Sequence, residues 1–427
     1  MVAQLRELAS GAGEMARGTA SAAGRTRVAF LFTGQGAQYP GMGRELDASE
    51  PVFRATLDRC AAVLDPLLGR PLRELMFDAT DGSLDQTGFT QPALYALEVS
   101  LAALWRSWGV EPSVVVGHSV GEFAAAAVAG VFSIEDGARL IAARGRLMQA
   151  LPAGGVMVSV QGDAALVQRE VAACPDKVSV AAYNAPGNLV IAGAKAEVEA
   201  IAARLAAQGL RTQALQVSHA FHSPLMAPML DELRRVAAGV AHSAPTLNWI
   251  SNLTGETVDW ARWGACMADY WTQHVREPVN FEKGMASSAE AACDAHLEVG
   301  PHPTLIGLGT QCLGADRPVE WLPSLKRTRP AWEQMLDSIA RLYVRGARID
   351  WQAFHGDGPR HSLQLPTYPF QRQSYIIPFA PKSRRPAGED VHELLGQRLT
   401  VAGVAAQFER TVDASHPALA AGSPRRR

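Results

Sequence analysis

The sequence predicts an α/β protein in which a large domain is built on a parallel sheet and a smaller module is inserted into it. Two observations carry this prediction. Over residues 27–152, apolar β-branched strand patterns alternate with longer helical patterns, which is typical of a parallel sheet with crossover helices. Residues 153–220 instead follow the order β-α-β-β-α-β, which is a different architecture.

The large domain is predicted over residues 27–152 and 221–325, after an N-terminal linker of residues 1–26 that is rich in Ala, Gly and Ser. Its first strand is the apolar run Arg27–Phe32, which ends in the turn Thr33–Gln38. The helices expected after this strand cover Leu57–Leu68, Ala93–Trp108, Phe123–Ala129 and Ile134–Gln149, with a second strand at Ser113–Val116.

The smaller module is predicted over residues 153–220. Its strands are expected at Val156–Val160, Val178–Tyr183, Leu189–Ala192 and Arg211–Val217, and its helices at Ala164–Ala173 and Lys195–Gln208. This order is that of the split, ferredoxin-like module. The alternative is that all six elements extend one sheet.

The C-terminal part differs from both domains in composition. Residues 326–377 are predicted to form a linker, with an amphipathic helix at 331–346 and an extended Pro/aromatic segment at Leu365–Gln371. Residues 378–427 turn to Pro, Arg and Gly and lack a complete core of their own. We expect them to be a flexible tail that includes the start of a truncated following domain.

Composition excludes several functional classes. A net charge of −2 and 48% hydrophobic residues describe an ordinary globular protein, with no electrostatic reason to expect nucleic acid or a membrane as a partner. The five scattered cysteines include no C-x-x-C pair, so we expect reduced thiols and a cytoplasmic location, and neither a disulfide framework nor a metal site. Asn252-Leu253-Thr254 matches a glycosylation sequon, but the N-terminus lacks the apolar core of a secretory signal.

Residues Gly117–Gly121 read Gly-His-Ser-Val-Gly, directly after the strand pattern and before the helix pattern. A serine on such a turn is raised above the sheet, and the helix N-terminus directs backbone N–H groups at an oxyanion formed there. The two glycines leave room for the strained turn. The sequence therefore predicts a nucleophile elbow with Ser119 as nucleophile, on an α/β-hydrolase-like large domain.

A serine hydroxyl needs an adjacent base. His222, in the segment His219–Ser223, lies where the chain leaves the small module and re-enters the large domain, so it can face Ser119 across a crevice. His118 is expected to point away from the site if the strand alternation continues. The acid of a triad stays open: Asp136, Asp163 and Asp176 are the candidates, and a Ser–His dyad is the alternative.

Two further features point to the same edge of the sheet. The turn Gly34-Gln35-Gly36 follows the first strand, so the backbone N–H groups of Gln35 and Val120 can form an oxyanion hole, unless this is an ordinary tight turn. Arg144 lies on an otherwise apolar helix. It needs an acidic side chain or an anionic ligand as partner, unless it is a solvated charge near the helix end.

Together, these motifs resemble the malonyl-type acyltransferase domains of modular (type I) polyketide synthases, which are related to the malonyl-CoA:acyl-carrier-protein transacylases. The resemblance covers about residues 27–377, and Leu365–Gln371 resembles the linker that follows such domains. The motifs that carry it, in order, are Phe32–Gln38, Thr90–Ala93, Gly117–Gly121, Arg144–Arg146, Tyr183–Pro186, His219–Ser223 and Glu298–Pro301.

The resemblance implies a role for each candidate residue. Ser119 would be the nucleophile and His222 its base, with the oxyanion hole at Gln35 and Val120. Arg144 would bind the free malonyl carboxylate. No acidic third residue is implied, because the backbone carbonyl of His274 would orient the ring of the base.

The resemblance also implies the walls of the substrate pocket. Gln91 and Asn184 would line it. The segment His219 to His222 reads His-Ala-Phe-His, which resembles the malonyl-selective pattern, whereas methylmalonyl-selective relatives usually carry Tyr-Ala-Ser-His. His219 and Phe221 are therefore expected to contact the substrate, and Val120 in place of Gln fits the same selectivity.

The implied activity is transfer of malonyl from malonyl-CoA, through a malonyl-serine, to the phosphopantetheine thiol of an acyl carrier protein in polyketide or antibiotic synthesis, with no bound cofactor. The implied partners are the carrier protein, a ketosynthase and, because His392–Gly396 and Phe408–Glu409 resemble its opening, a dehydratase. The alternatives are a serine hydrolase or thioesterase on a similar fold, a methylmalonyl-selective acyltransferase, and a docking segment that has lost activity.

Overall fold

The computed structural model of the chain describes residues 26–314, 317–356, 371, 373, 375, 395–399, 403 and 405–410. They belong to two units, Met1–Gly358 and Pro359–Arg427. In the second unit, β11 (Gln397–Leu399) pairs antiparallel with β12 (Gln407–Glu409). Most of the predicted N-terminal linker, of the segment Leu365–Gln371 and of the predicted tail lies outside the described residues.

The larger sheet of the first unit has five strands in the order β10-β9-β1-β2-β7, and every neighbouring pair is parallel. This confirms the predicted parallel α/β sheet. All five residues of the central β1 are buried, as expected for a strand covered by helices on both faces. The strands are β1 (Val28–Phe32), β2 (Pro112–Gly117), β7 (Asn248–Ile250), β9 (Ala295–Val299) and β10 (Glu320–Pro323).

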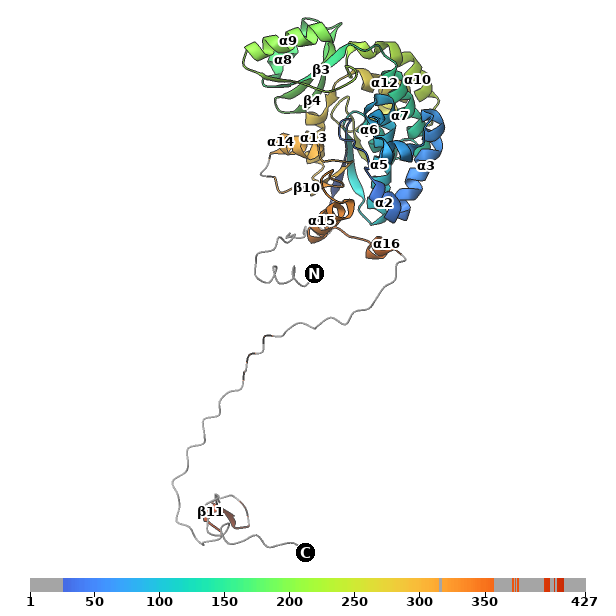
Figure 1. Cartoon of the computed structure of the whole chain (residues 1–427). Helices are drawn as coiled ribbons and strands as arrows, with labels where there is room; N and C mark the ends of the chain where they lie inside the picture. The colour runs from blue at the N-terminus through green and yellow to red at the C-terminus, as the bar shows by residue number, and fades with distance from the viewer. Residues whose placement is uncertain are drawn as a thin grey trace. The chain divides into compact units, whose positions relative to one another are not determined.

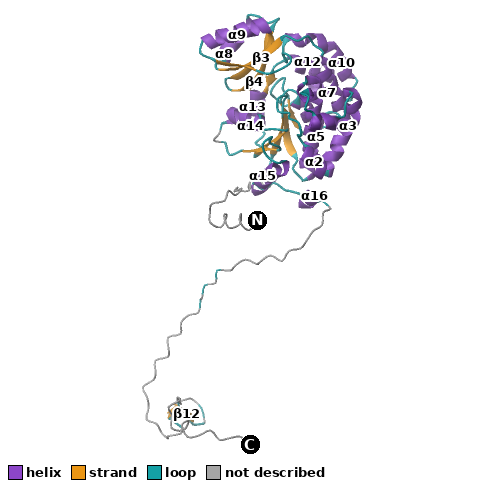
Figure 2. Cartoon of the chain, in the orientation of Figure 1, coloured by secondary structure: helices purple, strands orange, loops and turns teal. Residues whose placement is uncertain are grey.

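Helices cover both faces of this sheet (Figure 1, Figure 2). On one side lie α3 (Pro51–Leu68), α5 (Thr87–Ser107), α6 (Gly121–Val128) and α7 (Ile134–Gln149), and on the other α13 (Phe281–Glu290) and α14 (Leu305–Leu313). The remaining described helices outside the smaller module are α2 (Arg44–Ser49), α4 (Leu72–Asp78), η1 (Ser83–Asp85), η2 (Pro224–Met229), α10 (Leu230–Ala238), α11 (Trp260–Trp263), α12 (Met267–Arg276), α15 (Ala331–Val344) and α16 (Trp351–His355). Within the described residues, none of the helices combines the length and apolar character needed to cross a bilayer.

The smaller sheet has the order β6-β3-β5-β4-β8 and its own apolar core of Val, Ile and Leu side chains. Its first four strands alternate with α8 (Ala164–Ala172) and α9 (Lys195–Ala207) in the β-α-β-β-α-β order, so the inserted ferredoxin-like module is confirmed and the single extended sheet is not. The strands are β3 (Gly155–Gln161), β4 (Val178–Ala185), β5 (Asn188–Ala194), β6 (Arg211–Ala214) and β8 (Val279–Asn280).

One strand of this smaller sheet comes from the large domain. β8 pairs parallel with β4 through Val279 and Asn280, far along the chain from the rest of the module. β6 also ends at Ala214, earlier than the predicted strand. The chain between Ala214 and β8 therefore crosses from one sheet to the other and returns, which brings His222 between them.

The order of the larger sheet decides which turns meet at its carboxyl edge. β1 lies beside β2, so the turn after Phe32 comes next to the elbow after Gly117. β7 lies on the other side of β2, with Val116 opposite Ile250. Since parallel strands end at the same edge, the residues that follow these three strands gather around Ser119.

Candidate active site

Ser119 lies on the turn between β2 and α6 with φ = 51°, in the left-handed region that costs a non-glycine residue about 1–3 kcal/mol. Close packing holds this turn. A Cβ on Gly117 would lie 2.2 Å from the backbone N of Glu122, and one on Gly121 would lie 2.2 Å from the carbonyl oxygen of Phe32. Only glycine fits at positions 117 and 121, two residues before and two residues after the serine. The predicted elbow geometry is therefore present.

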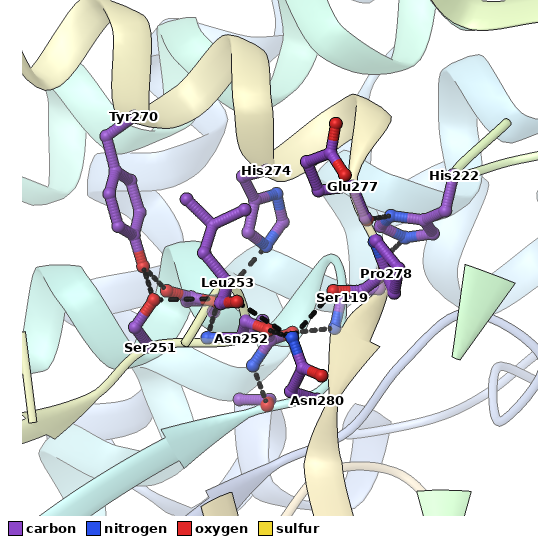
Figure 3. A network of polar contacts seen from close by, with 12 residues as sticks. Ser119, His222, Ser251, Asn252, Leu253, Tyr270, His274, Glu277, Pro278 and Asn280 are labelled. Atoms are coloured by element: carbon purple, nitrogen blue, oxygen red, sulfur yellow. Dashed lines mark hydrogen bonds and ion pairs between the residues drawn. The ribbon is translucent and has the colours of Figure 1, made fainter. Parts of the chain in front are cut away.

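The structure brings Ser119 and His222 together although 103 positions separate them (Figure 3). Ser119 Oγ lies 2.7 Å from His222 Nε2, within hydrogen-bonding distance. His222 also has a positive φ, of 54°, and its carbonyl accepts a hydrogen bond from the Ser179 hydroxyl of β4. The small module thus helps to hold the histidine in a conformation that is uncommon for its residue type.

The group that orients the His222 ring differs from the prediction. His222 Nδ1 lies 2.9 Å from the backbone carbonyl of Glu277, so the expected carbonyl of His274 is corrected to that of Glu277. The physical reason is helix geometry: His274 lies inside α12, whereas Glu277 follows the last helical residue in an extended conformation that turns its carbonyl away from the helix. The His274 ring instead lies 3.2 Å from Glu122 Oε2.

The open question of a third, acidic group is also answered for the described residues: no carboxylate contacts His222 there. Asp136 lies in the first turn of α7, where its carboxylate accepts a hydrogen bond from the N-cap Ser133 and pairs with Arg139. Asp163 caps α8, and Asp176 is exposed. The arrangement is therefore a Ser–His dyad with a backbone carbonyl behind it.

The environment keeps His222 neutral. Burial lowers the pKa of His222 well below the usual histidine value, and the neighbouring His274 and Arg144 lower it further. Because Nδ1 faces a carbonyl, that nitrogen carries the ring proton and Nε2 is the lone-pair nitrogen facing Ser119. The ring is thus suited to accept the hydroxyl proton.

Arg144 is buried beside the nucleophile, with an exposed fraction of 1%. Its Nη2 donates to Ser119 Oγ at 3.2 Å, its Nε has no hydrogen-bond partner, and its Cζ lies 5.4 Å from the centre of the Phe123 ring. Burial lowers the pKa of Arg144 to about 9, an effect that Glu122 opposes. No described carboxylate forms an ion pair with Arg144, so this cation remains available to an anionic ligand.

The two residues predicted to supply the oxyanion donors, Gln35 and Val120, line the same cavity as Ser119. Gln35 follows β1 and Val120 follows Ser119, and neither backbone N–H has a hydrogen-bond partner within the described part of the chain. The Ser119 N–H, by contrast, already donates to Asn252 Oδ1 at 2.7 Å. An oxyanion hole requires such N–H donors without another partner, so both residues remain candidates for it.

The cavity has a volume of about 180 Å³ and lies between the two sheets. Its walls contain the predicted Gln35, Gln91, Ser119, Val120, Arg144, Asn184, Phe221 and His222. His219 does not line it, contrary to the prediction. Its two ring nitrogens lie 3.0 Å from the Leu151 carbonyl and 3.0 Å from the Ser218 hydroxyl, so they are already engaged by other groups.

His118 lines the cavity, although strand alternation predicts that its side chain points away from the site. Its Nε2 lies 2.8 Å from Asn184 Oδ1, a contact that joins the elbow to β4 of the small module. Strand alternation gives the wrong answer here because β2 ends at Gly117, and the turn that follows has no period of two.

A polar network behind Ser119 was not predicted from the sequence. It is formed by the buried Glu122, Ser251, Asn252 and Tyr270 and the half-buried Asn280. Figure 3 labels its members apart from Glu122. The local signal is weak, since the strand before Asn252 has only three residues. A polar Ser-Asn pair after the buried Trp249 and Ile250 is the one hint in the sequence. No cluster of three or more metal-ligating side chains occurs in the part of the chain that the structure describes.

Comparisons with known proteins agree with this geometry. The sequence profile of the family described as "Acyl transferase domain" matches residues 29–349. Polyketide synthase GfsB of Streptomyces halstedii is 46% identical over 391 residues, which are 88% of this chain and 7% of that protein. The mycoketide-CoA synthase of Mycobacterium tuberculosis is 45% identical over 379 residues, 88% of this chain and 9% of that protein. The chain thus spans less than a tenth of the length of these curated relatives.

Solved structures show the same two-subdomain α/β fold. The acyltransferase domain from the second module of the salinomycin polyketide synthase is 47% identical, with a TM-score of 0.79 and 86% of each chain covered. The acyl carrier protein S-malonyltransferase from Vibrio cholerae O1 biovar eltor str. N16961 is 30% identical, with a TM-score of 0.65, covering 74% of this chain and 100% of that chain.

Proposed function

The chain belongs to the acyl transferase family, and from this premise we propose that it loads malonyl from malonyl-CoA onto the phosphopantetheine thiol of an acyl carrier protein during polyketide synthesis. It is an acyltransferase enzyme, so the alternative of an inactive docking segment is set aside. The polyketide synthase relatives support a place in a larger synthase, with a ketosynthase and a dehydratase as proposed neighbours.

One observation carries the malonyl assignment. Ser119 Oγ lies 2.7 Å from the Nε2 of the base His222 and 3.2 Å from Nη2 of the buried cation Arg144. A guanidinium in this position can bind the free carboxylate of a malonyl group in a bidentate manner. A neutral acyl group would leave the cation buried without a counter-charge, which is costly.

The first half of the reaction forms the malonyl-enzyme. His222 Nε2 accepts the proton of Ser119, and Oγ attacks the thioester carbonyl of malonyl-CoA. The tetrahedral oxyanion is stabilised by the N–H groups of Gln35 and Val120. The C–S bond then breaks, His222 returns its proton to the departing sulfur, and malonyl remains as an ester on Ser119.

The second half repeats these roles with a new nucleophile. The phosphopantetheine thiol of the carrier protein gives its proton to His222, and its sulfur attacks the ester carbonyl. The oxyanion forms in the same hole, the C–Oγ bond breaks, and His222 protonates the Ser119 oxygen. This transfer regenerates the free enzyme, and no cofactor takes part.

The hydrolase or thioesterase alternative finds less support. Its family pattern requires a carboxylate behind the histidine, and His222 donates to the Glu277 carbonyl instead. A fixed cation beside the nucleophile also has no use in a lipase-type pocket. Selection against methylmalonyl is the weaker part of the proposal, because Phe221 in the cavity wall discriminates one methyl group by only about 1–3 kcal/mol.

Competition between acyl donors tests this assignment. In an equimolar mixture of malonyl-, methylmalonyl- and acetyl-CoA, we expect the malonyl adduct on Ser119 to predominate, because it alone pairs with Arg144 without an extra methyl group. Intact-mass spectrometry with peptide mapping measures the adduct and its position. A predominant methylmalonyl adduct would establish the alternative extender unit, and a predominant acetyl adduct would contradict the role of the cation.

The lowered pKa of His222 predicts the pH dependence of acylation. The base acts in its neutral form, which persists at a lower pH when the pKa is lower, so kcat/KM for malonyl-enzyme formation should stay constant as pH falls through about 6.5 and decline only below it. Quenched-flow mass spectrometry across pH 5–8 measures this limb, with circular dichroism to show that the protein stays folded. A midpoint at or above the ordinary histidine pKa contradicts the expectation.

A further inference from the structure

Asn252 spans the nucleophile elbow without reaching the cavity. Its Oδ1 accepts a hydrogen bond from the Ser119 N–H at 2.7 Å, and its Nδ2 donates to the Gly117 carbonyl at 2.7 Å. Figure 3 shows it between Ser251 and Ser119, behind the nucleophile. One side-chain amide therefore holds two backbone groups on either side of His118.

Asn252 is itself held from two sides. Its backbone N–H donates to Glu122 Oε2 at 2.9 Å, and its carbonyl accepts from Asn280 Nδ2 at 3.1 Å. Asn252 has an exposed fraction of 3% and Glu122 of 0%. The amide can therefore shift little unless the buried carboxylate moves with it.

Glu122 is an anchor fixed by a separate element. It lies in the first turn of α6, and the Tyr270 hydroxyl of α12 donates to its Oε1. His274 Nε2, also on α12, lies 3.2 Å from its Oε2. The carboxylate thus ties α6, α12 and the loop after β7 together directly behind Ser119.

We propose that Asn252 is a positioning residue for acyl transfer, with Glu122 as its buried anchor: the amide holds Ser119 in the left-handed conformation that keeps Oγ at His222 and leaves the Val120 N–H free for the oxyanion. This inference rests on the proposed role of Ser119 as nucleophile. Without the amide, the Ser119 N–H and the Gly117 carbonyl lose their partners in a buried site, and the turn relaxes to regain hydrogen bonds. A displacement of about 1 Å can cost about a hundredfold in rate.

The test uses a probe that does not depend on malonyl recognition, an uncharged alkyl fluorophosphonate. Ser119 Oγ forms a bond to phosphorus, the P–F bond breaks, fluoride leaves and His222 accepts the serine proton. The full chain and its Asn252→Ala and Asn252→Asp variants are labelled over a range of probe concentrations. Intact mass gives the limiting rate and the half-saturating concentration. Asn248→Ala is the matched control, since Asn248 is on β7 and its side chain accepts an exposed hydrogen bond from Thr257, away from the elbow.

We expect Asn252→Ala to lower the limiting rate by about 10- to 100-fold with little change in half-saturation. Asn252→Asp should also be slower by about tenfold or more, because a carboxylate cannot donate to the Gly117 carbonyl. Asn248→Ala should stay within twofold. Glu122→Gln, whose amide oxygen can still accept the Asn252 N–H, should label faster than Glu122→Ala.

The outcomes separate this inference from the function it rests on. If wild-type protein is not labelled at Ser119, the proposed nucleophile is wrong. If wild type is labelled and a folded Asn252→Ala variant reacts within threefold of it, or changes only in half-saturation, the positioning role is wrong. Should Asn252→Ala not fold, the isosteric Asn252→Asp decides by the same criterion. The midpoint of the pH profile of labelling should not move in Asn252→Ala, since this change removes no charge and retains His222.

Discussion

Replacing Ser119 with alanine should abolish the malonyl-enzyme and lower transfer to the carrier protein by at least about 10⁴-fold. The side chain carries the atom that bonds to the acyl group, and among the described residues that line the cavity no other serine, and no cysteine, lies beside His222 Nε2. Removing the nucleophile of a serine enzyme costs nearly all of its rate enhancement, because the remaining groups cannot act without it. Radiolabelled malonyl-CoA followed by gel separation measures the adduct.

The matched control for this variant is Ser107→Ala, which removes a hydroxyl at the end of α5 that bonds only to the Leu104 carbonyl. It should label like wild type. The melting temperature of Ser119→Ala should equal that of wild type or be slightly higher. Alanine in this turn bears the same backbone strain as serine, and the lost hydroxyl forms hydrogen bonds with His222 and Arg144. Labelling of Ser119→Ala at the wild-type level would remove the residue from the mechanism.

Replacing Arg144 with alanine should reverse the substrate preference from malonyl-CoA to acetyl-CoA. Losing one partner of a buried ion pair typically costs about 3–5 kcal/mol, which is roughly a 10²- to 10⁴-fold loss in kcat/KM for malonyl. Acetyl transfer should change by only a few-fold or improve, because a neutral acyl group no longer leaves a bare cation in the wall. Adduct formation from each acyl-CoA, measured separately by intact mass, gives the ratio.

Two variants of the same helix sharpen this test. Arg146→Ala removes an exposed arginine two residues away on α7 and should leave the ratio unchanged. Arg144→Lys keeps a charge but not the planar fork, so it should recover only part of the malonyl preference. An unchanged malonyl-to-acetyl ratio in Arg144→Ala would show that another group binds the carboxylate.

Much of this site could be predicted from local patterns. The elbow at Gly117–Gly121 is recognisable because a strand, a turn with small residues and a helix follow one another within a short stretch of chain. The turn after β1 follows from the rule that parallel strands end at one edge. Arg144 was noticeable because a charge interrupted an apolar face, and the structure places all three features around one cavity.

Other parts depended on contacts that no local pattern encodes. β7 and β8 are three and two residues long, too short for a periodic signal, yet β7 delivers Asn252 to the elbow and β8 completes the smaller sheet. Because α12 ends at Arg276, Glu277 rather than His274 supplies the carbonyl that orients His222. The direction of His118 followed from where β2 stops.

The sequence by itself therefore determined the fold class and the elbow serine and singled out Arg144, since each signal depends on residues within one stretch of chain. The tertiary structure alone decided the partners of these groups: which carbonyl orients His222, which amide holds Ser119, and which predicted residues reach the cavity. The physical reason is that a hydrogen bond is decided within a few tenths of an ångström, and that precision arises only when strands and helices from distant parts of the chain pack together.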